Sequence, residues 1–358
     1  MRLLKNIDKY YLFSIFFIIV LILSTNHYSY DEALSLNQLD SKSYYLISSN
    51  YPNILFESDV PYHHYQRFLV PYIIGLLSDL TGLSIFNLYK LFVIITLIFI
   101  SILHKKIFYK IGYNFELAVV FLSMIIFSPY LSRYIISIPM MLVDLVFVLI
   151  CYVIILQYYS KSKLILALIP FSHVFRLTGL GILVSYIIST KIIWKKDYYK
   201  IIVITFFSFI IIYILSKFAN ISTGSKFNNS HYLGIFSEIS QKNSINLLFF
   251  TLKPLLIFLP LIIFLIFSKF NSKKIFARDS IFLLLTSLMF VGQPILGGEM
   301  VTGNNIFRLS SLSLPFLIFW VAKYFKPKFE LKKFYLYIII FNFLFSLHPT
   351  YSLVSYFR

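Results

Sequence analysis

Carboxylate side chains gather in one polar segment of this otherwise apolar chain, between residues 26 and 83. Asp31 and Glu32 stand side by side near its start, and Asp40 follows with Tyr44 four residues later. The other acids of the segment are Glu57, Asp59 and Asp79. A carboxylate can accept a proton as a general base, and several can hold a divalent cation together with phosphate oxygens. The alternative for any single acid is an ordinary solvated loop carboxylate.

Three arginines, Arg67, Arg176 and Arg308, lie beside or within apolar stretches. The planar guanidinium group pairs well with carboxylates and phosphates. Because an arginine in lipid is costly unless it is paired or faces a cavity, a functional role is the default hypothesis. Two alternatives stay open. Arg67 and Arg308 could extend to the outer headgroups, and Arg176 could form a purely structural buried pair with Asp144.

Two adjacent histidines, His63 and His64, come just before Arg67. Their imidazole rings could bind a sugar, a phosphate or a metal ion. The alternative is that they are plain surface residues, which is the commoner situation for histidines on a polar loop.

The composition of the chain indicates whether it folds in water or in a lipid bilayer. Hydrophobic residues make up 59% of the 358 residues and charged residues only 13%, with a mean hydropathy of +0.82. A soluble globular domain has roughly twice that charged fraction. The formal charge of +18 sits in short clusters between apolar runs, which argues against a nucleic-acid-binding face and follows the positive-inside pattern. The chain is therefore predicted to be an integral, multi-pass membrane protein with a cytoplasmic N-terminus.

The apolar runs predict an all-α bundle of about eleven membrane segments in one domain, 1–358. We expect them near residues 10–25, 84–103, 115–130, 135–159, 164–173, 175–190, 201–217, 247–267, 280–296, 306–325 and 334–347. The first is read as an uncleaved span. Segments 164–173 and 175–190 lie between two basic clusters, so we expect two short helices or one re-entrant pair. Within the first outer loop, 26–83, the segment Phe68–Leu80 is predicted to be an interfacial amphipathic helix.

Several motifs recur along the chain in an order that resembles the GT-C superfamily of membrane glycosyltransferases. A short first span is followed at once by a long loop with acids at its start. The further elements are Asp40 with Tyr44 and the apolar pair Leu46-Ile47, Arg67-x-Leu69-x-Pro71, Phe127-Ser128-Pro129-Tyr130 with Pro139 and Asp144, Arg176-x-Thr178-Gly179, and Arg308 with Leu314-Pro315. The resemblance covers most of residues 10–320, although 200–290 contribute little, and the chain lacks the large soluble C-terminal domain of some members.

This resemblance implies transfer of a sugar from a polyprenyl-phosphate donor to a glycan, lipid or protein acceptor at the outer face of a bacterial inner (plasma) membrane. It implies Asp40 as the general base, with Asp31 and Glu32 as rivals, and inversion by direct displacement. Arg67, Arg176, Arg308, Tyr44 and His64 are then the expected binding residues for the donor. No metal ligand is assigned, although a divalent cation such as Mg²⁺ or Mn²⁺ is compatible with the acids.

Other classes of membrane protein remain open. A transporter would place charges near the midplane of broken helices, often with an internal repeat, and only Asp144 and Arg176 suggest such a place. A flippase or polymerase of lipid-linked glycans would also bind polyprenyl phosphates through arginine. A non-catalytic membrane scaffold would tolerate loss of every acid in 26–66.

Overall fold

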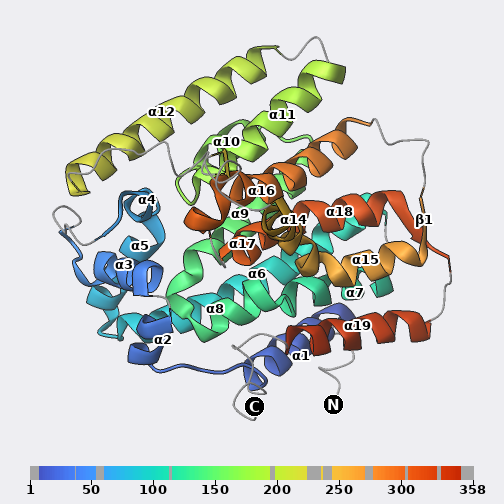
Figure 1. Ribbon diagram of the computed structural model, residues 1–358, viewed down its shortest axis with the longest axis horizontal. Helices are drawn as coiled ribbons and strands as arrows, with labels where there is room; N and C mark the ends of the chain where they lie inside the picture. The colour runs from blue at the N-terminus through green and yellow to red at the C-terminus, as the bar shows by residue number, and fades with distance from the viewer. Residues whose placement is uncertain are drawn as a thin grey trace.

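The computed structural model describes residues 8–36, 38–53, 60–112, 115–193, 198–223, 235–236, 244–270, 277–302, 305–328 and 332–347. Over these residues the protein is a bundle of helices with one small two-stranded ribbon, so the predicted all-α class is confirmed. Figure 1 shows α12 along one edge of the bundle and α1 with α19 along the opposite edge. Glu57 and Asp59, two acids of the first outer loop, lie outside the described residues.

The helices follow one another with few long connections. In chain order they are α1 (Lys9–Leu23), α2 (Tyr30–Leu36), α3 (Gln38–Ser49), α4 (Tyr62–Tyr65), α5 (Leu69–Thr81), α6 (Ile85–Ile111), α7 (Phe115–Ile126), α8 (Tyr134–Ser137), α9 (Leu142–Tyr159), α10 (Ile165–Ser172), α11 (Leu180–Ile193), α12 (Tyr198–Thr223), α14 (Ser244–Leu252), α15 (Leu259–Ile266), α16 (Arg278–Thr302), α17 (Asn305–Ser311), α18 (Leu314–Tyr324) and α19 (Lys332–Ser346). Strand β1 (Ser268–Phe270) pairs antiparallel with β2 (Phe325–Pro327), a ribbon that the sequence did not predict.

Five helical stretches are long and apolar enough to cross a membrane. They are Ile85–Ile111, Pro139–Tyr159, Tyr198–Ala219, Asn246–Ile266 and Arg278–Gly298. Two bent pairs, Phe115–Ile126 with Pro129–Ser137 and Asn305–Ser311 with Leu314–Tyr324, bring the number to seven if each pair is one span. The chain is thus a multi-pass membrane protein with five to seven candidate spans among the described residues.

Each of the eleven predicted segments coincides with helix, but four of the segments correspond to a single short helix. Helix α1 has 15 residues, α11 has 14, α19 has 15 and α10 has 8. At about 1.5 Å per residue, a 15-residue helix covers about 22 Å of a hydrocarbon core of about 30 Å. Eleven crossings therefore stay a prediction. The pair 164–173 and 175–190 consists of two short helices joined by a turn at 173–179.

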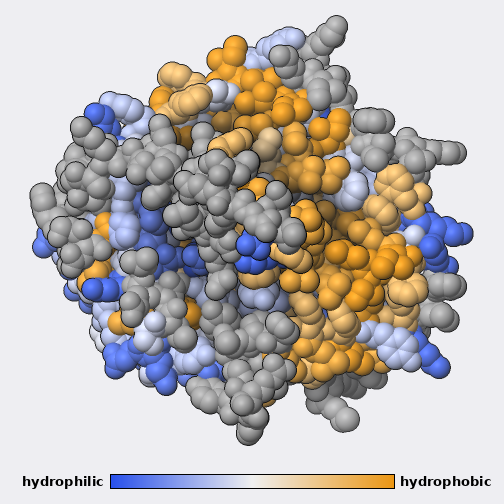
Figure 2. All heavy atoms as spheres, viewed as in Figure 1, coloured by the Kyte–Doolittle hydropathy of each residue, from blue (hydrophilic) through white to orange (hydrophobic). Residues whose placement is uncertain are grey.

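Charged contacts and apolar surface indicate how the bundle lies in the bilayer. Lys105 pairs with Asp8 and Lys323 pairs with Asp279, and both pairs lie where the basic clusters predict the cytoplasmic side. Figure 2 shows an apolar band between a hydrophilic face over α2–α5 and a second hydrophilic edge opposite to it. A protein that spans a membrane presents this sequence of surfaces, because charged groups are costly in the hydrocarbon region.

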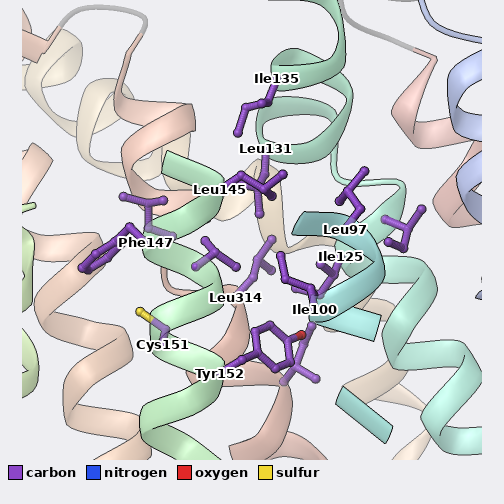
Figure 3. Packing of buried hydrophobic residues seen from close by; sticks show 14 of the residues in the cluster. Leu97, Ile100, Ile125, Leu131, Ile135, Leu145, Phe147, Cys151, Tyr152 and Leu314 are labelled. Carbon is purple, nitrogen blue, oxygen red and sulfur yellow. The ribbon is translucent and has the colours of Figure 1, made fainter. Parts of the chain in front are cut away.

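The buried interior is built around α9. Figure 3 shows Leu145, Phe147, Cys151 and Tyr152 of this helix among the buried side chains of its neighbours. Leu97 and Ile100 from α6, Ile125 from α7 and Leu314 from α18 complete this packing. Because α9 is packed on several sides, its first residues at the outer end have fixed positions, and this fixes the place of Asp144.

A buried arginine that sequence reasoning did not single out joins the outer ends of two terminal helices. The Arg133 guanidinium donates to the Ser24 carbonyl at 2.5 Å, to Thr25 Oγ1 at 2.9 Å and to Ser346 Oγ at 2.9 Å. The Ser24 carbonyl at the C-terminal end of α1 thereby accepts from a cation, which the helix dipole also favours. Arg133 is a structural residue that connects α1 with α19.

The outer-loop helix α3 lies so close to α5 that only glycine fits between them. A Cβ added at Gly75 would overlap the Ser48 carbonyl oxygen and would lie 2.9 Å from Tyr51 Cβ. The Ser48 hydroxyl donates to the Pro71 carbonyl at 2.9 Å and lies 2.8 Å from the Tyr89 hydroxyl. Helix α5 occupies the predicted interfacial segment and holds α3, which carries Asp40, against the bundle.

We expect Gly75→Ala to lower the stability of the protein. Because the new methyl group meets backbone atoms, α3 and α5 must separate, at a cost of about 1–3 kcal/mol. Thermal unfolding of the purified protein in detergent measures this as a lowered Tm. Gly292→Ala in α16 is the matched control, since an added Cβ there meets nothing within 4 Å. Equal Tm values for the two variants would contradict the close α3–α5 packing.

Candidate functional site

Side chains from distant segments meet where α3, α4, α9 and α17 converge, on the side of the bundle that the basic clusters predict to be the outer one. We call them the outer cluster. Its members are Asp40 and Tyr44 on α3, His64 on α4, Arg67 in the following turn, Asp144 on α9, Arg176 after α10 and Arg308 on α17. Of the residues expected from the sequence to act as the base or to bind the donor, all except Asp31 and Glu32 belong to it. A continuous series of contacts connects its members.

Asp40 is held on both carboxylate oxygens. Its Oδ2 accepts from the Arg308 guanidinium at 2.6 Å, and its Oδ1 lies 2.9 Å from His64 Nε2. Burial alone would raise the pKa of the Asp40 carboxyl. Arg308 and His64 outweigh that effect and hold the pKa well below its ordinary value. Asp40 is therefore ionised across the physiological pH range, in a position that is only 9% exposed.

Arg308 connects this carboxylate to a second one in the interior. Its Nε lies 3.5 Å from Asp144 Oδ2, and its guanidinium donates to the Tyr134 hydroxyl at 3.3 Å. Asp144 is fully buried and pairs directly with Arg176, which is 2% exposed. The pairing of Arg176 with Asp144, one of the two readings from the sequence, is thus present in the structure. Tyr134 is one of 28 tyrosines, so no sequence signal could have identified it.

Arg67 differs from the other two arginines. Its guanidinium is half-buried and donates to the Tyr44 hydroxyl at 3.2 Å. In the part of the chain that the structure describes, no carboxylate lies within ion-pair distance of Arg67. The Tyr44 ring in turn packs on the His64 ring, with centroids 5.3 Å apart. Arg67 is therefore a cation in contact with the cluster whose charge is not neutralised by a partner.

The charges of the outer cluster do not cancel. Burial, reinforced by Arg67 and Arg308, lowers the pKa of His64 below its ordinary value although Asp40 opposes the shift. With His64 neutral, three guanidinium groups face two carboxylates, which leaves one net positive charge. An unpaired charge that is partly removed from water is costly, so a site with this imbalance favours an anionic ligand.

The donor atoms for a metal ion are present in one part of the cluster. Asp40, His63 and His64 each offer a ligand atom, and these atoms lie within 4.8 Å of one another. Two imidazoles and one carboxylate suit Zn²⁺ better than the Mg²⁺ or Mn²⁺ considered from the sequence. However, Arg308 and His64 already occupy both oxygens of Asp40, and the net positive charge opposes a dication. The arrangement fits an anion better than a metal ion.

Asp31 and Glu32 lie apart from the outer cluster, at the start of α2. Glu32 accepts from the Ser29 backbone N–H at 2.8 Å and from the Ser29 hydroxyl at 2.9 Å, and the Glu32 N–H donates back to Ser29 Oγ at 3.3 Å. These hydrogen bonds form a capping box, which the Ser-x-x-Glu spacing encodes. Both side chains are exposed, and no ion pair joins either carboxylate to the cluster within the described ranges.

No model of a known protein family matches the chain, and neither does any curated protein or solved structure with which it was compared.

Loss of the Asp144 carboxylate should destabilise the protein strongly. In Asp144→Asn, Arg176 and Arg308 keep their charges without this partner, which costs about 3–5 kcal/mol for a broken buried pair. Thermal or chemical unfolding in detergent gives the value. Asp79→Asn, an exposed carboxylate on α5, is the control and should change stability by less than about 0.5 kcal/mol. A small effect at Asp144 would show that Asp144 and Arg176 are solvated rather than paired in the interior.

Proposed function

We propose that this protein transfers a sugar from a polyprenyl-phosphate donor to an acceptor at the outer face of the membrane. The observation that supports this most directly is the outer cluster itself. A buried, ionised carboxylate lies beside an imidazole and an unneutralised guanidinium, in a multi-pass membrane protein. A polyprenyl-phosphate sugar brings the complementary parts, which are one negative phosphodiester charge and a long apolar tail.

The arginines supply the electrostatic part of the reaction. When the bond between the sugar and the phosphate breaks, the leaving phosphate gains negative charge, and preformed cationic donors stabilise that transition state. Arg67 can meet the phosphate without giving up an ion pair. Arg308 is the second cation in reach of the cluster, but its contact with the phosphate competes with its contact with Asp40.

We propose that the lipid tail of the donor lies beside α12. The Tyr62 hydroxyl donates to the Ser216 carbonyl at 3.4 Å, and the Phe68 ring lies 4.7 Å from the Phe218 ring. These contacts attach α12 to the segment that carries His64 and Arg67. The side chains of Phe209, Tyr213 and Ile214 on α12 are exposed, as in a lipid-facing helix. A donor whose tail lies in the bilayer beside α12 has its phosphate next to the outer cluster.

Translocation of a lipid-linked glycan is the second candidate function. The Arg176–Asp144 pair lies beside the break between α10 and α11, and α16 contains a break at Gly298, where φ is 77°. Broken helices with buried charge are typical of transporters. A flippase binds the donor and moves it without breaking the glycosidic bond, so donor cleavage distinguishes the two functions.

Asp40→Asn should abolish most of the donor cleavage. We expect a fall in kcat of about 10²–10⁴-fold, the range for loss of general-base assistance, whether Asp40 takes the proton itself or orients the group that does. The assay is release of polyprenyl phosphate from labelled polyprenyl-phosphate hexoses and pentoses by the protein in liposomes, with a membrane-lipid extract as acceptor. Asp79→Asn is the control, and Asp31→Asn and Glu32→Gln test the rival acids. Full activity of Asp40→Asn beside loss in Asp31→Asn would move the base to α2.

Arg67→Gln should weaken donor use with little loss of stability. Removal of one cationic donor to the leaving group costs about 10²–10³-fold in rate by analogy with oxyanion donors. Arg176→Gln is the matched comparison, because it leaves Asp144 buried without its direct partner and so should lower the Tm. The pair is measured by donor cleavage and thermal unfolding side by side. Equal loss of Tm in both variants would contradict the distinction between a neutralised and an unneutralised arginine.

A further inference from the structure

Asp40 and His64 differ in how many of their polar atoms have a polar contact. Arg308 donates to Asp40 Oδ2 at 2.6 Å, and His64 Nε2 lies 2.9 Å from Asp40 Oδ1. Both oxygens of Asp40 therefore already have a partner in the cluster. His64 Nδ1 is buried and has no partner among the described residues, whereas Nε2 has the 2.9 Å contact with Asp40, which is not aligned as a hydrogen bond. The polar atom of this pair that has no polar contact is therefore His64 Nδ1.

The neighbours of His64 determine which nitrogen carries the proton. Asp40 is an ionised acceptor, so the proton of a neutral imidazole belongs on Nε2, which lies 2.9 Å from Asp40 Oδ1. The lone pair then lies on Nδ1. A carboxylate that fixes one nitrogen of a histidine and leaves the other as acceptor is the arrangement by which histidine acts as a general base.

We propose that His64, oriented by Asp40, is the general base that activates the acceptor hydroxyl. The assignment rests on the proposed sugar transfer. As the acceptor oxygen bonds to the anomeric carbon, its proton passes to His64 Nδ1. The bond from that carbon to the phosphate oxygen breaks, and its electron pair leaves with polyprenyl phosphate. Asp40 stabilises the imidazolium that forms, which later returns its proton to water. Asp40 is thus a positioning residue.

The charges around His64 are consistent with this role. The groups that face it are Asp40 and Tyr44 from α3, Arg308 from α17, and His63 and Arg67 from its own segment. Burial and the two arginines keep the pKa of His64 below its ordinary value, so the imidazole is neutral at pH 7. The Arg67 N–H also donates to the His64 carbonyl at 2.9 Å, which ties the base to the phosphate-binding arginine.

The test compares His64→Gln with wild type by donor cleavage in liposomes across pH 4.5–9. The glutamine Nε2 can keep the contact with Asp40, but the basic nitrogen is lost. We expect kcat to fall by at least about 10²-fold, while KM for the donor changes little. The fall in wild-type activity at acidic pH, expected below pH 6.5 because the pKa of His64 is lowered, should disappear in the variant. His27→Gln, an exposed histidine of the same loop, should behave as wild type.

A second variant, His64→Ala, tests the same assignment if His64→Gln disturbs folding. His64→Ala leaves a space for the ring, and added imidazole should restore part of its activity. Wild-type rates and pH dependence in His64→Gln would overturn the assignment. Equal loss in His63→Gln, together with loss of wild-type activity on chelation, would make His64 a metal ligand and overturn it too. A folded wild type that cleaves no polyprenyl-phosphate sugar would overturn the proposed function itself, and the base assignment with it.

Discussion

The bridge made by Arg308 is the interaction on which the rest of the site depends. A guanidinium in the interior must meet negative charge, and Arg308 meets two carboxylates, Asp40 at 2.6 Å and Asp144 at 3.5 Å. Asp144 also pairs with Arg176. These contacts couple the outer helix α3, the central helix α9, the turn after α10 and the late helix α17. None of these elements can shift without exposing an unpaired charge to an apolar environment.

Close backbone packing is the second constraint on the fold. It is needed because the hydrophobic effect drives little association between helices in lipid. Gly75 lets α5 touch α3, and Ser48 bonds to the Pro71 carbonyl and meets the Tyr89 hydroxyl. Arg133 joins the ends of α1 and α19 in a similar way, through carbonyl and hydroxyl oxygens. The outer helices are thus held by small residues and by polar contacts in an apolar setting. The position of Asp40 follows from this scaffold.

The three arginines of the site differ in whether a carboxylate pairs with them, and this difference determines the net charge of the site. Arg176 and Arg308 are neutralised by aspartates, and Arg67 contacts only the Tyr44 hydroxyl among the partners that the described residues offer. One positive charge is therefore left beside a histidine whose Nδ1 is buried without a hydrogen-bond partner among the described residues. An anionic ligand at Arg67 would bring the cluster to neutrality without breaking an existing pair. This is why we favour a lipid phosphate as the ligand over a metal ion.

The sequence by itself determined where the helices run and which charges are expensive. Long apolar runs fix helices locally, and every predicted segment coincides with helix, although four are shorter than a straight crossing needs. Arginine among apolar residues is costly, which identified Arg67, Arg176 and Arg308 from the sequence, although the same argument applies to Arg133 and was not applied there. The Ser29-x-x-Glu32 spacing also encoded a helix cap, which is a local feature.

Only the tertiary structure decided that Asp40, and not Asp31 or Glu32, meets Arg308 across 268 residues of sequence. Helix formation depends on neighbours a few residues away, whereas an ion pair depends on a distance in space that the local sequence does not contain.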